Sequence, residues 1–567
     1  MHRTAADIPH GALLRAEVVV VGGGPLGIVT ALELADRGRR VLLVESGHLA
    51  ANDAAQDLSN PGAGGDDSWH VAKPLAVRRQ LGGASTMWGG RSVPFDPIDY
   101  EPRVAQPEDL WPIRYADVAP YLQRACEWCQ CGRPIFNAMQ LPELASRQMI
   151  PGFPDGIVRT TDLERWALPT RFGRFYLKRL IEHPNLDLVT GLTCVHVACT
   201  PSGGAVSHLE LRGLDGEQAV ATADHYVIAA GGLETTRLLL ASDDIHPEGI
   251  GNHSDHLGRW YMAHVEARVA SLHLDTPPES TIYDHERDAD GVYVRRRFTI
   301  EPKEQDRLGL LNGAVWIVNP ELGDASHGSG ILSGVYLALR SPLGRFMLAE
   351  AIRTAHTKTT ARVDLRAHLR NIFVDFVPSA IFAVTFTWAR FLRRGRKAPG
   401  FFVSSAANVY PLHYHGEHLP SRDSRVELTD ERDALGMRRL RTLMTFCEAD
   451  ITNVRRTHEL IDAGLRESGV GHIEYTVDDV EAAVTDYLKG NAGYHQTGTT
   501  RISATPTDGV VDSDLRVHGI SNLSISSMSV FPTSSQANPT LTGVALAVRL
   551  AEHLDTALGN AARHPTD

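Results

Sequence analysis

Two segments near the C-terminus carry side chains that can bind or move a proton. His495 lies in the glycine-rich run 490–501, and Asn538 precedes Pro539 and Thr540. Imidazole, with an unperturbed pKa of ~6.5, is the side chain best suited to accept a proton near neutral pH. A lone histidine is more often structural, however, and Asn538 has the ordinary alternative role of capping a helix that begins at Pro539. The two segments by themselves leave catalysis and structure open.

A glycine turn stands between predicted elements near the N-terminus. Residues 18–21 are four valines, typical of a strand in a parallel sheet that is covered on both faces, and residues 28–37 repeat apolar side chains at helical spacing. A second apolar run, 41–44, completes a βαβ unit. The turn has the spacing G-x-G-x-x-G, and its candidate cofactor-binding residues are Gly22, Gly24, Pro25, Leu26 and Gly27.

This unit predicts a dinucleotide site. Gly22 permits the tight turn, Gly24 lets a pyrophosphate approach the backbone, and Gly27 lets helix and strand pack closely. Free N–H groups and the helix dipole then hold the diphosphate. Glu45 ends the second strand, where a carboxylate can accept hydrogen bonds from both ribose hydroxyls. A glycine motif alone is weak evidence, but all of these features occur here in the expected order.

Further segments are predicted to belong to the same domain. Residues 81–90 contain four glycines without a regular period, which indicates a loop with close backbone approaches. Residues 224–230 form an apolar strand that leads through Gly231 into a helix. Residues 186–200 and 206–211 alternate like a hairpin. The nucleotide domain is therefore expected to be discontinuous in sequence.

Together these segments resemble the glucose–methanol–choline (GMC) family of FAD enzymes, with ordered matches from residue 17 to about 555. The His-then-Asn pair is similar to the branch that contains pyranose 2-oxidase, fructose dehydrogenase and aminoglycoside alcohol oxidases of the paromamine type. Other members carry a second histidine at the position of Asn538. The motifs are the 22–27 turn, the Gly83-x-Ser85-x-x-Trp88-Gly89-Gly90 loop, the His495-x-x-Gly498-Thr499 loop and Asn538-Pro539-Thr540.

The resemblance implies an α/β fold with a Rossmann-like FAD-binding domain and an α+β substrate domain built on an antiparallel sheet. The expected FAD-binding domain comprises residues 1–100, 190–260 and 491–567. The expected substrate domain comprises 101–189 and 261–490, with a helical insertion near 342–397. Besides the turn and Glu45, the candidate cofactor-binding residues are Gly83, Ser85, Trp88, Gly89, Gly90, Val195, Ala230, Gly231, Ser527, Pro539 and Thr540.

The resemblance also implies a reaction. His495 would take the hydroxyl proton of an alcohol while hydride passes to flavin N5, and Asn538 would orient the same hydroxyl. The helix that begins at Pro539 would stabilise the negative charge of reduced flavin. The expected substrate is a sugar-like alcohol (a sugar, glycoside or amino sugar), oxidised to a carbonyl, with oxygen or another acceptor taking the electrons. Neither the exact substrate nor the acceptor is encoded in a recognisable motif.

Two positions depart from the family pattern. Met87 stands where some sugar oxidases carry the histidine that holds flavin covalently, so we expect non-covalent FAD. Ser527 stands where relatives often carry aspartate, which leaves the detailed contacts of this residue with the cofactor undetermined.

Two other functions compete with this interpretation. A nicotinamide dehydrogenase would explain residues 22–45 but would leave His495 and Asn538 without a role. A flavoprotein without redox turnover, either a lyase on the same scaffold or a binding module, would use the same cofactor site. Reduction of bound flavin by an alcohol distinguishes the expected enzyme from both.

Two groups of metal-binding residue types occur away from these motifs. Neither has the spacing of a complete four-ligand site, so we expect core packing for the cysteines, pocket lining for the histidines, and no metal. The groups are Cys126, Cys129 and Cys131, and His413, His415 and His418.

The composition is that of a globular enzyme. The 567 residues are 43% hydrophobic and 22% charged, and 56 Lys and Arg against 68 Asp and Glu give a net charge of −12, which argues against a nucleic-acid partner. Six cysteines are too few for a disulfide scaffold, and the first twenty residues lack the apolar segment of an export signal. We expect a cytoplasmic protein.

The segment between residues 261 and 490 contains the elements expected of the substrate domain. Strands are predicted at 292–300 and 314–318, and helices at 342–357 and 438–468. Residues 372–389 are mostly apolar and are followed by five basic residues by position 397. We expect a buried or lid-like hairpin there, with contact to a membrane surface or a second subunit through 372–397 as alternatives and a membrane span as the least favoured.

Overall fold

A six-stranded parallel sheet forms the centre of one half of the molecule. The computed structural model describes residues 1–563 except 63–68, 168–169, 343, 345–352, 354–356, 358–362, 394 and 406. The strand order is β1 (His2–Thr4), β8 (Leu186–Thr190), β4 (Val41–Glu45), β3 (Val18–Val21), β12 (His225–Ile228) and β23 (Leu523–Ile525). Every residue of β3 and β4 is buried, as expected for a sheet covered on both faces.

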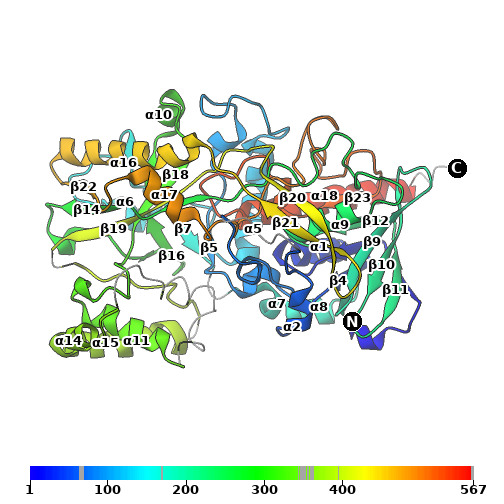
Figure 1. The fold of residues 1–567 in the computed structure, drawn as a ribbon, viewed down its shortest axis with the longest axis horizontal. Coiled ribbons are helices and arrows are strands. Elements are labelled where there is room, and N and C mark those ends of the chain that lie inside the picture. The colour runs from blue at the N-terminus through cyan, green and yellow to red at the C-terminus, as the bar shows by residue number, and fades with distance from the viewer. Residues whose placement is uncertain are drawn as a thin grey trace.

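Helices cover this sheet and extend the same core. α1 (Pro25–Asp36) packs on β3 and β4, and α18 (Thr540–Arg563) packs on α1. α9 (Gly232–Ala241) follows β12, as the second predicted strand-to-helix turn requires. The sheet and helices occupy the right of Figure 1, where the N-terminal (blue) and C-terminal (red) segments lie side by side. The predicted α/β class and the discontinuous Rossmann-like domain are confirmed.

The predicted hairpin around residue 200 differs in one respect. Residues 186–190 form β8 in the parallel sheet, and β9 (Thr193–Cys199) starts a separate four-stranded sheet in the order β2 (Ala12–Arg15), β11 (Gln218–Thr222), β10 (Val206–Arg212) and β9. Gly191 divides the two strands because its φ of +84° interrupts extended backbone. The domain boundary expected at 189–190 therefore falls inside β8 and belongs before residue 186.

A further segment assigned to the substrate domain packs on the nucleotide half. α5 (Leu122–Cys129) contacts α18, and its buried Cys126 and Cys129 lie in the same hydrophobic core as β3. The expected core role of these cysteines therefore fits their position. The expected border at residue 101 does not fit, because the side chains that follow it bury their apolar surface against the parallel-sheet half.

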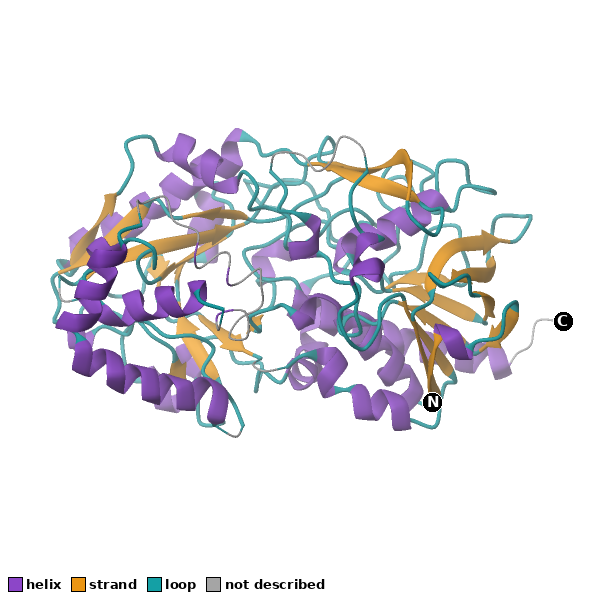
Figure 2. Cartoon of the chain, turned by 60° about the horizontal axis from the view of Figure 1, so that its bottom comes forward, coloured by secondary structure: helices purple, strands orange, loops and turns teal. Residues whose placement is uncertain are grey.

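The other half is built on an antiparallel sheet, as expected. Its strand order is β22 (Gly471–Tyr475), β14 (Ala270–Leu274), β19 (Val409–Gly416), β18 (Gly313–Ile317), β17 (Phe298–Ile300) and β6 (Val158–Arg159), with β13 (Val265–Ala267) also paired to β19. α16 (Glu448–Ser468) packs on β22 and α17 (Val480–Leu488) on β13. A smaller sheet has the order β15 (Glu286–Arg287), β16 (Tyr293–Arg296), β7 (Leu163–Trp166) and β5 (Arg91–Ser92). Figure 2 shows the two halves side by side.

Three sequence expectations in this half require comment. The strand predicted at 292–300 is two strands, β16 and β17, in different sheets. The helix predicted at 438–468 begins only at 448, because β21 (Arg438–Leu443) pairs with β20 (Arg425–Arg432) across a turn in which Gly436 has a φ of +85°. The helix predicted at 342–357 lies almost wholly outside the described residues.

The helical insertion forms a lobe at the lower left of Figure 1. It consists of α11 (Gly330–Arg340), α14 (Leu365–Val374), α15 (Phe376–Thr387) and a π-helical turn (Trp388–Leu392). None of the described helices is by itself long and apolar enough to cross a bilayer. The pair 365–374 and 376–392 passes that test only together and is bent by 89°. The expected burial is not found, because α15 has no buried residue.

Shorter helices connect these parts. They are α2 (Asp53–Asp57), α3 (Lys73–Ala76), α4 (Tyr115–Val118), α6 (Pro142–Ala145), α7 (Phe172–Phe175), α8 (Leu177–Glu182) and α10 (Pro302–Arg307).

Candidate active site

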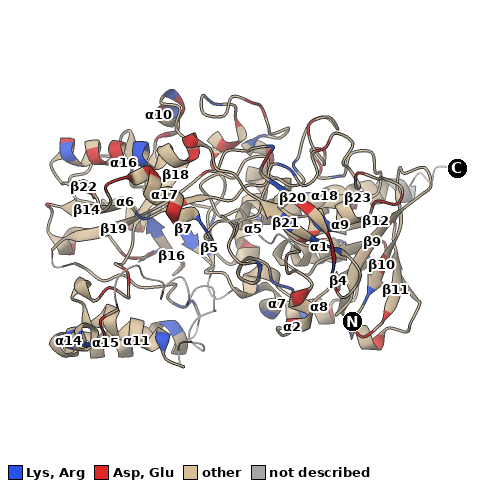
Figure 3. Cartoon of the chain, in the orientation of Figure 1, with Lys and Arg blue, Asp and Glu red and all other residues tan. Residues whose placement is uncertain are grey.

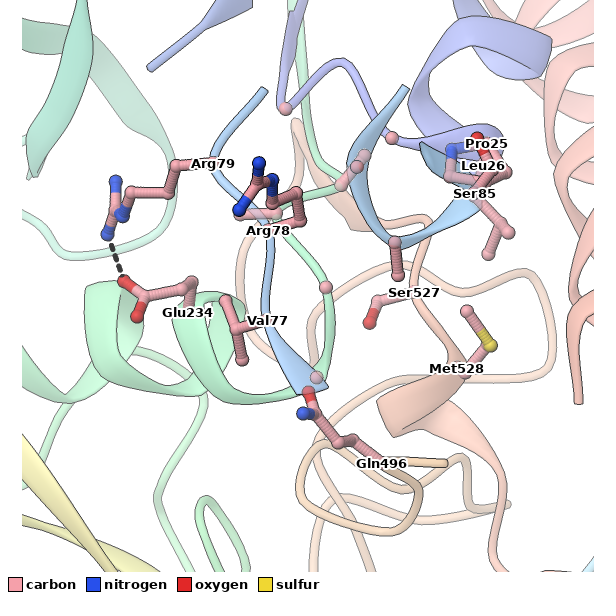
Figure 4. Close-up of a pocket in the computed structure, with 18 of the residues that line it drawn as sticks. Pro25, Leu26, Val77, Arg78, Arg79, Ser85, Glu234, Gln496, Ser527 and Met528 are labelled. Atoms are coloured by element: carbon pink, nitrogen blue, oxygen red, sulfur yellow. Dashed lines mark hydrogen bonds and ion pairs between the residues drawn. The ribbon is translucent and has the colours of Figure 1, made fainter. Parts of the chain in front are cut away.

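A cavity of about 540 Å³ opens at the carboxyl edge of the parallel sheet. β3 has β4 on one side and β12 on the other, so the strand order reverses there, and ligands of open α/β sheets bind at such a point. Gly22 follows β3, Glu45 ends β4, and Ala230 and Gly231 follow β12. All four line the cavity. Figure 4 shows how segments far apart in the sequence meet around it.

The glycine turn has the shape that a bound diphosphate needs. A Cβ atom on Gly22 would lie 2.5 Å from the Ala229 carbonyl oxygen, and one on Gly27 would lie 1.9 Å from the Gly22 carbonyl oxygen. Gly24 differs, because a Cβ there would meet no atom within 4 Å and Gly24 itself lines the cavity. Gly24 is also the N-cap residue of α1. The turn therefore leaves open space at a helix N-terminus, where anions bind.

Glu45 is held by backbone donors at the end of β4. Its Oε2 accepts a hydrogen bond from Gly23 N at 2.7 Å, and its Oε1 accepts one from Gly47 N at 2.6 Å. A carboxylate has about four acceptor positions, so both oxygens keep capacity for ribose hydroxyls. Sequence reasoning missed Gly23 and Gly47. Gly23 lies inside the glycine turn, and in the structure a Cβ there would lie 3.0 Å from the Glu45 carboxylate.

Most of the other candidate cofactor-binding residues line the same cavity. These are Pro25, Leu26, Gly83, Ser85, Trp88, Gly89, Gly90, Ser527 and Thr540. The hydroxyl of Ser85 is engaged within the protein, donating to Gly82 O and accepting from Phe172 N.

Three candidates do not line the cavity. Gly27 serves the packing of α1 on β3, and Pro539 precedes α18. Val195 is buried in β9, while Thr193 and Cys194 of the same strand line the cavity instead.

An ion pair at the cavity wall was not predicted. Arg79 pairs with Glu234 of α9, and the Arg79 Nε donates to Ser59 Oγ at 2.6 Å. Figure 4 shows this pair beside Val77 and Arg78. Residues 75–79 match no motif, so their position could not be predicted from sequence.

His495 and Asn538 meet in this cavity. His495 lies in the loop after α17 and Asn538 lies two residues before α18, and Asn538 Nδ2 donates to His495 Nε2 at 2.9 Å. A ring nitrogen that accepts a hydrogen bond carries its lone pair there. Burial, and second the Arg91 guanidinium, lowers the pKa of His495 to about 3, so the imidazole is neutral at pH 7. Asn538 Oδ1 has no hydrogen-bond partner among the described residues.

Two further histidines surround His495. The ring of His264 lies 4.8 Å from that of His495, and the ring of His415 lies 4.3 Å from that of His264. Their Nδ1 atoms face the carbonyl oxygens of Ser535 (3.1 Å) and Gln536 (2.8 Å). Burial lowers the pKa of both rings well below the usual value. Sequence reasoning considered His415 for another group and missed His264, which belongs to no motif.

These histidines form the one group among the described residues whose ligand atoms, all within 4.8 Å of one another, suit a metal. A structural zinc site takes four ligands, and the group supplies three, one of which is hydrogen-bonded to Asn538. The trio of Cys126, Cys129 and Cys131 and the trio of His413, His415 and His418 do not form such groups. The absence of a metal stays a prediction.

Charged and polar residues line the wall of the cavity next to His495. Glu266, Arg91 and Tyr494 all contribute to it. Arg91 pairs with Glu164 and lies over the Trp316 ring, 4.4 Å from its centroid. Burial raises the pKa of Glu266 in spite of two nearby guanidinium groups.

The Glu266 carboxylate has few partners. Its nearest cationic or imidazole neighbours are the Nε2 atoms of His413 and His415, at 3.6 and 3.8 Å, beyond hydrogen-bond distance. This carboxylate is therefore free to accept hydrogen bonds from a molecule in the cavity.

Comparison with known proteins agrees with this arrangement. Residues 420–547 match the model of the GMC oxidoreductase family, and residues 15–54 match that of an FAD binding domain. The second match covers β3, the glycine turn, α1 and β4.

Two characterised relatives align with nearly the whole chain, and a third aligns with part of it. A 6'''-hydroxyparomomycin C oxidase of Streptomyces lividus is 25% identical, over 95% of this chain and 92% of its own length. A paromamine 6'-oxidase of Streptomyces fradiae is 24% identical, over 94% and 90%. A fructose dehydrogenase large subunit of Gluconobacter japonicus is 25% identical, over 58% and 46%.

Solved structures share the fold. A pyridoxine 4-oxidase of Mesorbium loti superposes with a TM-score of 0.50 at 17% identity, covering 95% of this chain and 99% of its own. A formate oxidase of Aspergillus oryzae RIB40 superposes with a TM-score of 0.52 at 16% identity, covering 97% and 100%. Residues 420–547 therefore carry a GMC oxidoreductase domain and residues 15–54 an FAD binding domain, and over nearly its whole length the chain is similar to oxidases of paromamine and 6'''-hydroxyparomomycin C.

Proposed function

We propose that the chain oxidises a hydroxyl group of a sugar-like alcohol to a carbonyl with FAD, using His495 as the general base. One observation carries the proposal. The His495–Asn538 pair opens into the same cavity as the glycine turn and Glu45. A cofactor whose adenosine end rests at Glu45 can thus reach a proton acceptor inside a single cavity.

The chain's own residues supply proton transfer and orientation. FAD, when bound, supplies the hydride acceptor. The substrate hydroxyl displaces Asn538 Nδ2 from His495 Nε2, which then takes the hydroxyl proton, while the freed side-chain amide of Asn538 holds the oxygen. The alcohol loses one proton and one hydride, which leaves the carbonyl product. The N-terminus of α18, two residues from Asn538, favours negative charge beside it.

The wall of the cavity favours a hydroxyl-rich or amino-bearing substrate. The Glu266 carboxylate accepts hydrogen bonds from hydroxyl or ammonium groups, and Tyr494 and Arg91 add donors. The relatives support the same class, since their names refer to paromamine, a hydroxyparomomycin and fructose. We propose a sugar, glycoside or amino sugar as substrate and oxygen or another small oxidant as electron acceptor.

The test is an anaerobic screen of sugars, glycosides, amino sugars and simple alcohols against the purified yellow protein. The proposal expects bleaching of the visible flavin band by members of the sugar-like group. If no alcohol bleaches the flavin, the alternative of a non-redox flavoprotein, a lyase or a binding module, replaces it. The match of residues 15–54 to an FAD binding domain argues against the nicotinamide dehydrogenase alternative. The cytoplasmic location stays a prediction.

A further inference from the structure

The helical lobe carries an unusual concentration of exposed apolar side chains. Of the 22 large hydrophobic residues exposed in the described part of the chain, eleven lie between positions 365 and 392. Phe373 is 83% exposed and Val384 is 72% exposed. Monomeric soluble proteins rarely present contiguous apolar patches of this kind unless they mark an interaction site. The eleven residues are Leu365, Leu369, Phe373, Val374, Phe376, Val377, Ile381, Val384, Trp388, Phe391 and Leu392.

Only one side of the lobe is used for packing. α14 and α15 both contact α11, and Phe382 and Phe386 pack against Phe401. Nine of the twelve residues of α15 are exposed, and the three partly buried ones, Ser379, Phe382 and Phe386, lie at spacings of three and four, as one face of a helix does. No residue that the structure describes between 363 and 397 lines the cavity described above. Among the described residues, the outer face of the lobe is therefore neither core nor lid.

The charge of the segment is opposite in sign to that of the molecule. Residues 363–397 contain seven Lys and Arg against two Asp, whereas the whole chain has a net charge of −12. Both aspartates are engaged in backbone contacts. Asp364 accepts from Arg366 N and Ala367 N, and Asp375 Oδ2 accepts from Gly330 N at 3.0 Å. Figure 3 shows Lys and Arg, in blue, within the lobe.

Several of these basic side chains are available to a partner. Arg366 and Arg370 are exposed on α14, and Arg393 is partly exposed directly after the π-helical turn. Trp388 is 60% exposed at the end of α15, shortly before Arg393. An aromatic ring followed by basic residues is typical of segments that lie at the interface of a membrane with water.

We infer that the outer face of α14, α15 and the π-helical turn docks the enzyme on a membrane surface that contains anionic lipids. The bend of 89° means that the two helices do not form one straight span, and it lets both lie in the interface. Apolar side chains of such helices enter the headgroup and acyl boundary by about 5–10 Å, and each nearby Lys or Arg strengthens binding to anionic lipid.

A second copy of the chain is the less favoured occupant. A two-fold dimer would place the same patch on both sides of the interface, so two segments with the same excess of positive charge would face each other. A negatively charged lipid surface attracts the same charges, while the acidic remainder of the enzyme is repelled from it.

Vesicle flotation of the FAD-loaded enzyme tests the inference. We expect binding to vesicles of phosphatidylcholine with phosphatidylglycerol, and weak binding to phosphatidylcholine alone. The double variant Ile381→Glu/Val384→Glu is expected to lose binding at least tenfold, while the matched control Leu214→Glu, an exposed apolar residue on the other half, retains it. Arg393→Gln is expected to weaken binding about fivefold without touching the apolar face.

The outcomes distinguish a lipid surface from a second copy of the chain as the partner of the lobe. Flavin content and anaerobic reduction by substrate should be unchanged in all variants, so failure of the proposed function is seen independently of failure to bind vesicles. No binding to either vesicle, or binding that the double variant and Arg393→Gln leave intact, overturns the inference. It is also overturned if light scattering shows a dimer in the wild type that Ile381→Glu/Val384→Glu converts to a monomer.

Discussion

His495 Nε2 is the atom on which the proposed chemistry depends. General-base catalysis contributes about 10²–10⁴-fold. We therefore expect His495→Ala to reduce the rate of anaerobic flavin reduction by about that factor. His10→Ala, at an exposed histidine outside the cavity, is the control. Bound flavin should be retained in both variants, since no atom of His495 is needed by the glycine turn. Unchanged flavin bleaching in His495→Ala would remove the base assignment.

The pKa of His495 makes a second prediction. The ring must be neutral to accept a proton, and it is neutral above its pKa of about 3. kcat/KM should therefore stay level on the acid side down to about pH 4 and fall only below it. In Asn538→Asp a carboxylate beside Nε2 raises that pKa, so the acid limb should move to higher pH. A wild-type acid limb near the ordinary histidine value of ~6.5 would contradict the burial argument.

Glu266 makes a third prediction at this scale. A charged hydrogen bond contributes roughly 1.5–3 kcal/mol, so Glu266→Gln should raise KM for an amino sugar about tenfold or more. The KM for a neutral sugar should change less, because the amide still accepts a hydrogen bond. Equal changes for both substrates would show that Glu266 does not recognise a cationic group.

At the scale of helices and strands, the segments that could be predicted are those whose apolar residues and glycines follow a local pattern. β3, the glycine turn, α1 and β4 are adjacent in sequence, and their apolar runs and glycines follow from local geometry. Glu45 was found because it ends a strand whose neighbour carries the turn. Residues 438–443 were assigned to a helix. So short a mixture of Arg and Leu residues fits the helical period as well as the strand period.

No local pattern predicts the remaining residues of the site. His264 stands in no motif, and only the pairing of β13 with β19 brings it beside His415. Arg79 reaches Glu234 across 155 positions of sequence. Contacts of this kind depend on the tertiary fold, and a single sequence carries no local signal for them.

The packing of α1 on β3 supplies a prediction at this scale. Gly27→Ala would place a methyl group 1.9 Å from the Gly22 carbonyl oxygen. Because this oxygen belongs to the backbone, it cannot shift easily to relieve the clash. We expect a loss of stability of about 1–3 kcal/mol and a clear loss of bound flavin. Gly334→Ala, a helical glycine of α11 with no atom within 4 Å of the added Cβ, is the matched control. Thermal unfolding and flavin content measure both effects. Normal flavin content in Gly27→Ala would refute the role of this turn.

At the scale of the whole molecule, the site lies where the two halves meet. His264 and Glu266 come from the antiparallel half, and Asn538 and Glu45 come from the segments of the parallel-sheet half. The family resemblance implied this organisation through the order of its motifs, with borders at residues 101 and 190, but β8 and α5 pack with the parallel-sheet half. Residues buried between the two halves follow neither a helical nor a strand period, so no sequence pattern marks them.

For the complete holoenzyme we predict that FAD is bound non-covalently. Met87 lines the cavity, and a thioether does not form the covalent bond that a histidine at this position forms in some relatives. Acid precipitation should therefore release all of the flavin into the supernatant. Flavin that stays with the precipitated protein would contradict non-covalent binding.

A crystal structure of the FAD complex tests the central claim most directly, because that claim is spatial. We predict an adenosine ribose hydrogen-bonded to Glu45, a diphosphate against Gly24, and an isoalloxazine ring beside His495 Nε2 and Asn538. An isoalloxazine ring that lies remote from His495, or a ribose away from Glu45, would contradict the account.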